Sequence, residues 1–564
     1  MLDPPRTPRL VLAVLGLLTM VALGARLAGL RTRLPHQPDP DRYIVAEAAW
    51  RDRPADATTS SFEGYPQTIY PRLLSFLLYH LPGHSFTRTL PPEAPLAEHL
   101  AAASEPFVRG RLLIELLSLV AIPGTYFLAH RFLGAWTSLL AAAFMATSLA
   151  GLFYCEQARP HAASMGLSLL AMLAVLRIPR AVDLTAYSVA GVLCAIAVAC
   201  LWNGVFVCPA LLAAHLLAPR RRWIGFAIAV VAVAAAIPLF YGFLFERSLV
   251  SSDRVNLGLR HIGWETFNGA GFRQILGGFW SFDPVLVATA GVGILALTVR
   301  FALGIRPAAE VQRELLVAAT YPVGFVLFWG VMDAVPPRLS QSLLPYVAVL
   351  AAFGIQSLLP RRAPALASVA LALAALALPA FACAHLVATR SRPDTFTLAA
   401  RWIASNVDRG RDVVSIPLLA DLPIFSERSA LEEVPPALRT PWQRYQVRLA
   451  PEPPVPGFHL RTVCSREILA DRRVDPDEVA ALLATERPAY VLVVVHADSG
   501  NVWDLTREVV RGNGNVLAAS FAPSASASED LLDLGFERGE RALQKVLATE
   551  RPGPDVEIYR MRDR

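Results

Sequence analysis

Two aspartates follow the first apolar run of the sequence, where residues 35–41 read PHQPDPD. A carboxylate held within hydrogen-bond reach of a hydroxyl can act as a general base and remove its proton. Prolines flank Asp39 and restrict the local backbone, which would hold its carboxylate in place. The competing interpretation of Asp39 and Asp41 is a solvated loop whose prolines end a helix. These residues alone leave both interpretations open.

A second set of polar residues can bind phosphate. The planar fork of an arginine side chain matches phosphate oxygens, and Arg111, Arg159 and Arg338 each lie at the edge of an apolar run. Glu156 is a candidate second acid, or a loop carboxylate that pairs with Arg159. His161 can contact phosphate or begin the next helix. For each arginine the alternative is an interfacial anchor whose head group reaches the membrane surface.

Long apolar runs must position these residues. The chain has 564 residues, of which only 17% are charged, and its mean hydropathy is +0.43. A helix needs about 20 apolar residues to cross hydrocarbon, and most of the runs are near that length. We therefore predict a mostly α, polytopic membrane protein with about eleven spans. The runs begin near Leu10, Leu112, Ala135, Ala162, Leu184, Val205, Ile224, Pro284, Leu315, Leu343 and Pro364.

Arginines predict the orientation of these spans. Every second connection is basic, as the cytoplasmic segments of membrane proteins are. The N-terminus is therefore expected in the cytoplasm, and an odd number of spans places the chain after about residue 388 outside it. The basic segments contain Arg6, Arg9, Arg131, Arg177, Arg180, Arg220 to Arg222, Arg300, Arg306, Arg313, Arg361 and Arg362.

The last part of the sequence predicts a separate small domain. We expect a membrane domain over residues 1–389 and an extracytoplasmic α/β domain over residues 390–564. Val-rich runs alternate with helical patterns there, which is typical of layered α/β folds. No phosphate loop or nucleophile elbow is found, so we expect this domain to supply no catalytic acid. The expected strands are Asp412–Ile416, Ala489–Val495, Val516–Phe521 and Val556–Tyr559.

The net charge of +6 does not indicate nucleic-acid binding. Lys545 is the only lysine, so the basic charge is nearly all arginine and lies between apolar runs, where membrane orientation explains it. The six cysteines form no CxxC pair, which excludes the usual zinc and redox motifs.

The order of the motifs resembles the GT-C superfamily of membrane glycosyltransferases. The similarity is to bacterial members related to protein O-mannosyltransferases and to the lipid A aminoarabinose transferase. Many relatives have a contiguous Asp-Glu pair after span one, whereas Pro40 separates the two aspartates here. The motifs that carry the resemblance are Arg26-Leu27, the acidic stretch at Asp39 and Asp41, Tyr70-Pro71, Arg111, the loop from Glu156 to His161, and Arg338 to Pro345.

This resemblance implies transfer of a sugar from a polyprenyl-phosphate donor to a hydroxyl of a glycan, lipid or protein. Asp39 or Asp41 would be the base of an inverting reaction, with Glu156 assisting the acceptor or a divalent metal. Arg111, Arg159, His161 and Arg338 would bind the donor phosphate. No cofactor is required by the sequence, and the resemblance leaves a divalent metal open. The alternative is a polytopic transporter or an envelope-assembly protein without transferase activity.

The orientation can be tested with reporter fusions. A fusion after Arg222 should report a cytoplasmic position, because that segment is basic. A fusion after Arg564 should report an extracytoplasmic one. A cytoplasmic signal from the second fusion would contradict the predicted topology.

Overall fold

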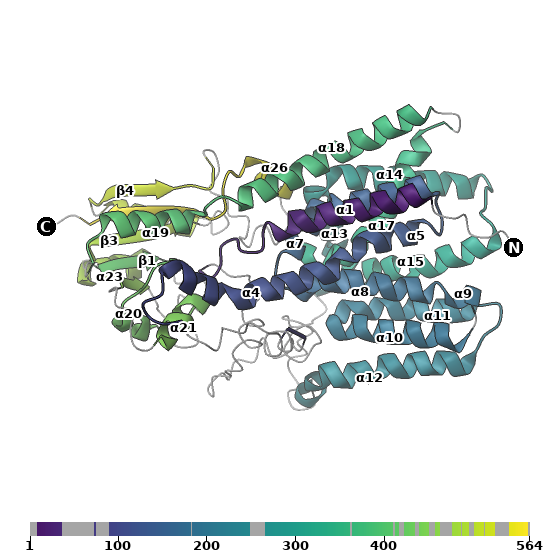
Figure 1. Ribbon diagram of the computed structural model, residues 1–564, viewed down its shortest axis with the longest axis horizontal. Coiled ribbons are helices and arrows are strands. Elements are labelled where there is room, and N and C mark those ends of the chain that lie inside the picture. Colours follow the sequence, from purple (N-terminus) through teal and green to yellow (C-terminus); the bar gives the residue numbers. More distant parts are fainter. Residues whose placement is uncertain are drawn as a thin grey trace.

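The computed structural model describes most of the chain. The described residues are 8–36, 73–74, 90–181, 183–248, 266–360, 364–409, 412–416, 422–434, 439–449, 457–462, 476–486, 488–495, 501–512, 514–524 and 541–561. Figure 1 shows an elongated molecule in which long helices run side by side along the longest axis. A β-sheet lies at one end, and the N-terminus lies at the other.

The long helices form a bundle. They are α1 (Arg9–Leu27), α4 (Leu96–Leu119), α5 (Ala121–Ala129), α6 (Ala135–Ala146), α7 (Leu149–Cys155), α8 (Pro160–Val175), α9 (Ile178–Ala181), α10 (Leu184–Cys200), η1 (Trp202–Phe206), α11 (Val207–Leu217), α12 (Trp223–Ser248), α13 (Ala270–Phe282), α14 (Pro284–Ala302), α15 (Ala309–Gly330), α16 (Pro337–Ser340), η3 (Gln341–Leu343), α17 (Leu344–Leu358) and α18 (Ala365–Arg390).

The bundle has the composition of a membrane domain. Among the described residues, seven helices are long and apolar enough to cross a membrane, and the count is eight if α6 and α7, which are bent by 51° relative to each other, form one span. Three shorter apolar helices cover Leu184–Cys200, Trp202–Leu217 and Trp223–Leu239. Together they correspond to the eleven apolar runs of the sequence. The predicted fold class is confirmed: a polytopic helical domain is followed by a small α/β unit.

Large apolar side chains cover the outside of the bundle. Ile224 on α12 is 73% exposed, and Leu366 on α18 is 80% exposed. In hydrocarbon such exposure is favourable, because lipid chains replace water around these side chains. Helices satisfy their own backbone hydrogen bonds, which is why the apolar runs must be helical at this depth.

The part of the chain that follows α18 is built around a five-stranded sheet of order β2-β1-β3-β5-β4. The strands β1, β2 and β3 are parallel, whereas β5 is antiparallel to both β3 and β4. The elements are α19 (Thr395–Asn406), β1 (Asp412–Ile416), α20 (Arg428–Glu433), α21 (Pro441–Arg448), β2 (His459–Thr462), α23 (Pro476–Glu486), β3 (Tyr490–Val495), α24 (Asn501–Gly512), β4 (Val516–Phe521), α26 (Ala542–Ala548) and β5 (Asp555–Arg560).

Helix α4 connects the bundle to this sheet domain. The second apolar run of the sequence begins near Leu112, but the chain is already helical from Leu96. This extension packs on α21, where His99 Nδ1 lies 3.0 Å from the Tyr445 hydroxyl and Trp442 is fully buried. Burial against α21 therefore stabilises a stretch that is too polar to be a span.

Helix α26 makes a second connection. Ser281 Oγ accepts a hydrogen bond from the backbone N–H of Ala542, and Val546 is buried in the main bundle core. Near the end of α18, the side chains of His385 and Thr389 both donate to the carbonyl of Thr549, at 3.0 and 3.2 Å. The sheet domain is thus fastened to the bundle through α26 as well as through α4.

Candidate active site

The predicted catalytic aspartates, Asp39 and Asp41, lie outside the described residues. The described chain continues past the end of α1 as far as His36, which precedes Asp39 by three residues. We call Gly29 to His36 the post-span segment. A residue adds at most about 3.5 Å to a chain, so Asp39 lies within about 11 Å of His36.

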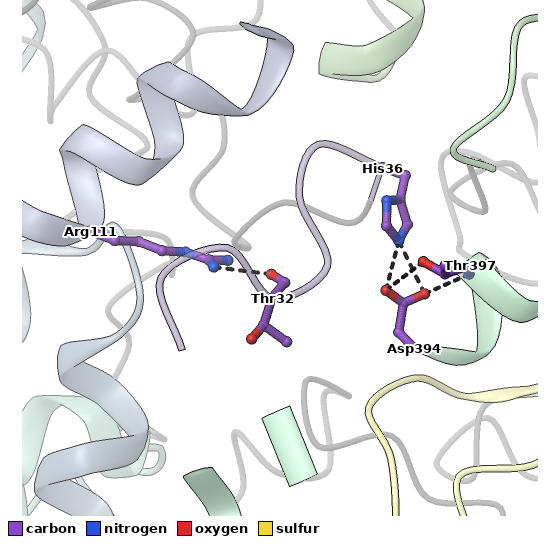
Figure 2. A network of polar contacts seen from close by, with 5 residues as sticks. All are labelled: Thr32, His36, Arg111, Asp394 and Thr397. Atoms are coloured by element: carbon purple, nitrogen blue, oxygen red, sulfur yellow. Dashed lines mark hydrogen bonds and ion pairs between the residues drawn. The ribbon is translucent and has the colours of Figure 1, made fainter. Parts of the chain in front are cut away.

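Arg111 holds the start of the post-span segment. It is buried on α4, and its Nη1 donates to the carbonyl of Leu30 at 2.9 Å. The same nitrogen donates to the carbonyl of Thr32 at 3.0 Å (Figure 2). Backbone carbonyls in a turn need such donors when water is excluded. The structure therefore gives Arg111 a positioning contact, and its predicted role in phosphate binding stays a prediction.

Glu156 lies directly against the same segment. It follows α7, is buried, and forms an ion pair with Arg390 at the end of α18. The Arg390 guanidinium also lies 5.4 Å from the ring centre of Phe153. A Cβ atom on Gly29 would approach the carboxylate oxygens of Glu156 to 2.8 Å. The Glu156 carboxylate is thus enclosed between a cation and the turn that follows α1.

Arg159, His161 and Arg338 form a second group of polar side chains. Arg159 is the residue before α8, His161 is in the first turn of α8, and Arg338 lies in α16. Arg159 and His161 are both buried, and the charges of both arginines act on the His161 ring. The Nδ1 atom of His161 makes no hydrogen bond within the described part of the chain. The structure therefore gathers three of the four residues that the sequence predicts for phosphate.

The surroundings suit an anion. Two guanidinium groups offer paired donors of the kind that bind phosphate oxygens, and an imidazole adds another. The N-terminus of α8 contributes the positive end of its dipole at the same place. Arg159 is three residues from Glu156, so this cluster and the post-span segment are neighbours.

A buried carboxylate in α4 completes the charge pattern. Glu115 is fully buried, and the charges of Arg26, Arg111 and Arg390 all act on it. Neither of its carboxylate oxygens has a hydrogen-bond partner among the described residues. Arg26, near the end of α1, donates to Ser118 Oγ at 2.9 Å. Arg111 precedes Glu115 by one helical turn, but the charges of Arg26 and Arg390, from other helices, act on Glu115 as well.

The described residues contain no group of three or more His, Cys, Asp or Glu side chains that could hold a metal ion. The family resemblance associates Glu156 with a metal, but in this structure its carboxylate forms an ion pair with Arg390. We therefore derive no step of the chemistry through a metal.

Sequence reasoning missed three residues of this region: His36, Arg390 and Asp394. Arg390 ends the last span on the side opposite to the basic connections, which is an exception to the arginine pattern and could have drawn attention to it. His36 and Asp394 contact each other across 358 positions of sequence, a pairing that residue spacing does not reveal.

Comparison with known proteins finds no matching family model and no matching curated protein. Several solved structures are similar. ArnT from Cupriavidus metallidurans, in the apo state, has 14% identity and a TM-score of 0.46 over 90% of this chain and 96% of its own. An Archaeoglobus fulgidus oligosaccharyltransferase tethered with an acceptor peptide has 12% identity and a TM-score of 0.46 over 89% of this chain and 71% of its own.

The arabinofuranosyltransferase AftD from Mycobacteria is also similar, with 17% identity and a TM-score of 0.42. The match covers 98% of this chain and 40% of AftD, so the chain spans less than half of that protein's length. By name, AftD is an arabinofuranosyltransferase and the Archaeoglobus protein is an oligosaccharyltransferase.

Replacing Gly29 by Ala tests the packing around Glu156. The added methyl would force the carboxylate away from its position beside Arg390, and such overpacking typically costs about 1–3 kcal/mol. The midpoint of thermal unfolding in detergent should therefore fall. Gly24→Ala is the matched control, because a Cβ atom there meets nothing within 4 Å. Equal midpoints for the two variants would contradict the described packing.

Proposed function

We propose that this protein is a membrane glycosyltransferase that moves a sugar from a polyprenyl-phosphate donor to an acceptor hydroxyl. The observation that carries the proposal is the grouping of Arg159, His161 and Arg338, where Arg159 follows Glu156 by three residues and Glu156 packs against Gly29 of the post-span segment. This cluster suits a departing phosphate, and the neighbouring segment leads to two carboxylates that can accept a proton. Transfer from a phosphate-linked sugar requires both functions close together.

In the proposed reaction, Asp39 or Asp41 takes the proton of the acceptor hydroxyl. The oxygen attacks the anomeric carbon of the sugar, and the bond from that carbon to the phosphate oxygen breaks. The bonding electron pair leaves with the polyprenyl phosphate, whose charge the two arginines stabilise. Attack from the side opposite to the phosphate inverts the anomeric configuration. Glu156 orients the post-span segment in this scheme, because Arg390 already neutralises its carboxylate.

We further propose that the reaction takes place on the outer face of the plasma (inner) membrane. The sheet domain and the N-terminus lie at opposite ends of the molecule, and the short helix α9 lies towards the end that carries the N-terminus (Figure 1). The basic residues around α9 suit the cytoplasmic side. The end with the candidate site then faces outward, where a glycan, a lipid or a protein can supply the hydroxyl.

The phosphate assignment predicts a defect in donor use. Arg159→Ala and Arg338→Ala should each raise the donor KM by about 10- to 100-fold, because a hydrogen bond to a charged group contributes about 1.5–3 kcal/mol. Lysine at either position should restore the enzyme only in part, since it keeps the charge and loses the planar fork. The measurement is transfer by the full chain in membranes at varied donor concentration.

Arg273→Ala provides the control, because Arg273 is an exposed arginine on α13. It should leave the donor KM unchanged. If both alanine variants of the cluster behave like this control, Arg159 and Arg338 do not bind the donor.

The base assignment predicts a defect in turnover. Asp39→Asn keeps the size of the side chain and removes its basicity, so kcat should fall by roughly two to four orders of magnitude, the usual contribution of a general base. Donor binding should survive. The exposed acid Glu98, changed to Gln, is the control.

Asp41→Asn decides between the two aspartates. An active Asp39→Asn enzyme with an inactive Asp41→Asn enzyme would assign the base to Asp41. Full transfer by both variants would refute the glycosyltransferase proposal and favour the transporter or assembly alternative.

A further inference from the structure

Three arginines gather at the end of the bundle opposite to the sheet domain. Arg180 belongs to α9, which lies towards the end that carries the N-terminus (Figure 1). Arg177 immediately precedes α9, and Arg131 lies between α5 and α6. We call these residues the α9 arginine group. Arg177 follows Arg159 by 18 residues, mostly those of α8, which is about 27 Å along a helix axis. The group is therefore separate from the cluster that we assign to the donor phosphate.

A buried carboxylate organises the α9 arginine group. Glu314 on α15 accepts hydrogen bonds from Nε and Nη2 of Arg180, the latter at 2.8 Å. Its Oε1 atom also lies 3.7 Å from Nη1 of Arg131. A paired contact of this kind fixes the plane of a guanidinium group. The Glu314 side chain is 0% exposed, whereas those of Arg131 and Arg180 are 20% and 40% exposed. Glu314 thus holds two guanidinium groups together while part of each stays accessible.

Positive charge exceeds negative charge in this group. Burial lowers the pKa of the Arg131 guanidinium, and the charges of Arg180 and Arg177 lower it further, whereas Glu314 opposes them. Among the described residues, the ion pairs of the group involve one other carboxylate, Glu310, which is 70% exposed and 3.9 Å from Arg180. Water and salt screen a carboxylate that is so exposed. A bound anion would therefore reduce the repulsion among the three guanidinium groups.

The neighbouring helix offers apolar surface. Helix α9 packs against α11, on which Leu212 and Leu216 lie one turn apart and are 45% and 43% exposed. Exposed leucines on a span contact the hydrocarbon chains of lipids. Because α11 ends at Leu217, Leu216 lies at the edge of the apolar region. An anion with hydrocarbon chains suits this position better than a free phosphate ion does.

We propose that the α9 arginine group binds the phosphate of an anionic phospholipid in the leaflet opposite to the sheet domain. The phosphate oxygens accept hydrogen bonds from the accessible N–H groups of Arg131 and Arg180, and Arg177 adds a third positive charge. Basic groups between helices at a membrane edge recognise anionic headgroups in this way. The inference concerns lipid binding and stability, so it does not depend on the proposed transfer reaction.

Two lipids that differ only in headgroup test the site. Native mass spectrometry of the full chain in detergent measures its affinity for dioleoyl phosphatidylglycerol and for dioleoyl phosphatidylcholine. Arg177→Gln should bind phosphatidylglycerol about 5-fold more weakly than wild type, which is the usual contribution of one basic residue near an anionic headgroup. Affinity for phosphatidylcholine, whose headgroup has no net charge, should not change. Arg222→Gln is the matched control, because Arg222 is an exposed arginine of another basic connection, and it should keep wild-type affinity.

The buried carboxylate supplies a second measurement. Glu314→Gln removes the negative charge between the guanidinium groups, so the thermal unfolding midpoint should fall in phosphatidylcholine. Phosphatidylglycerol should raise the midpoint of this variant more than that of wild type, because the lipid phosphate replaces the missing charge. An ion pair with a structural role alone would give the same loss in both lipids.

Each experiment has an outcome that overturns the proposal. Equal affinity of Arg177→Gln and Arg222→Gln for phosphatidylglycerol would mean that the lipid responds to the general charge of this face. An equal loss for Glu314→Gln in both lipids would leave the group a structural ion pair. Inorganic phosphate that stabilises the wild type as much as phosphatidylglycerol does, but not Arg177→Gln, would assign the site to a free phosphate ion.

Discussion

The ion pair between Arg390 and Glu156 lies where four parts of the chain meet. Arg390 ends the last span, and the sheet domain starts at Asp394, four residues after Arg390. Glu156 follows the helix pair α6 and α7, and Gly29 begins the post-span segment. Removing one partner of such a buried pair typically costs about 3–5 kcal/mol, because the other charge is left unpaired in a poorly solvated place. The pair therefore constrains the segment after α1, the turn before α8 and the sheet domain together.

The charges around this pair form one group. The charges of Arg26, Arg111 and Arg390 act on Glu115, and Arg390 also pairs with Glu156. Ionisable residues at the edge of a membrane domain are expensive and usually serve function. Three cations against two carboxylates leave a positive excess close to the cluster of Arg159, His161 and Arg338. A bound anionic group, such as the donor phosphate that we propose, would neutralise this excess positive charge.

Much of the fold could be predicted from the sequence, because burial in lipid and burial in a soluble core each require a recognisable pattern of apolar residues. Apolar runs must be helical in hydrocarbon, and four of the five strands carry Val-rich or alternating patterns. The strand β2 has only one strongly apolar residue, Leu460, and pairing with β1 supplies its stability. The start of α4 could not be predicted for a similar reason. Ala102 and Ala103 are buried there by packing against Trp442 on α21, a residue that is distant in the sequence.

The candidate site could be predicted only where its residues share a helix end. Arg159, His161 and Arg338 were predicted as a group because each borders an apolar run, and their role in phosphate binding stays a prediction. The contacts of His36 with Asp394 and of Thr32 with Arg390 join residues that are 358 positions apart. No local pattern encodes such pairs, and Arg111 likewise reveals its carbonyl partners only in three dimensions.

The central claim is that this membrane protein transfers sugar from a lipid carrier. Mass spectrometry of surface glycans, glycolipids and glycoproteins, in cells with and without the protein, tests it most directly. We expect one sugar modification to disappear with the protein, and its unused polyprenyl-phosphate donor to accumulate. Identical glycan profiles and unchanged donor levels in the two strains would contradict the account.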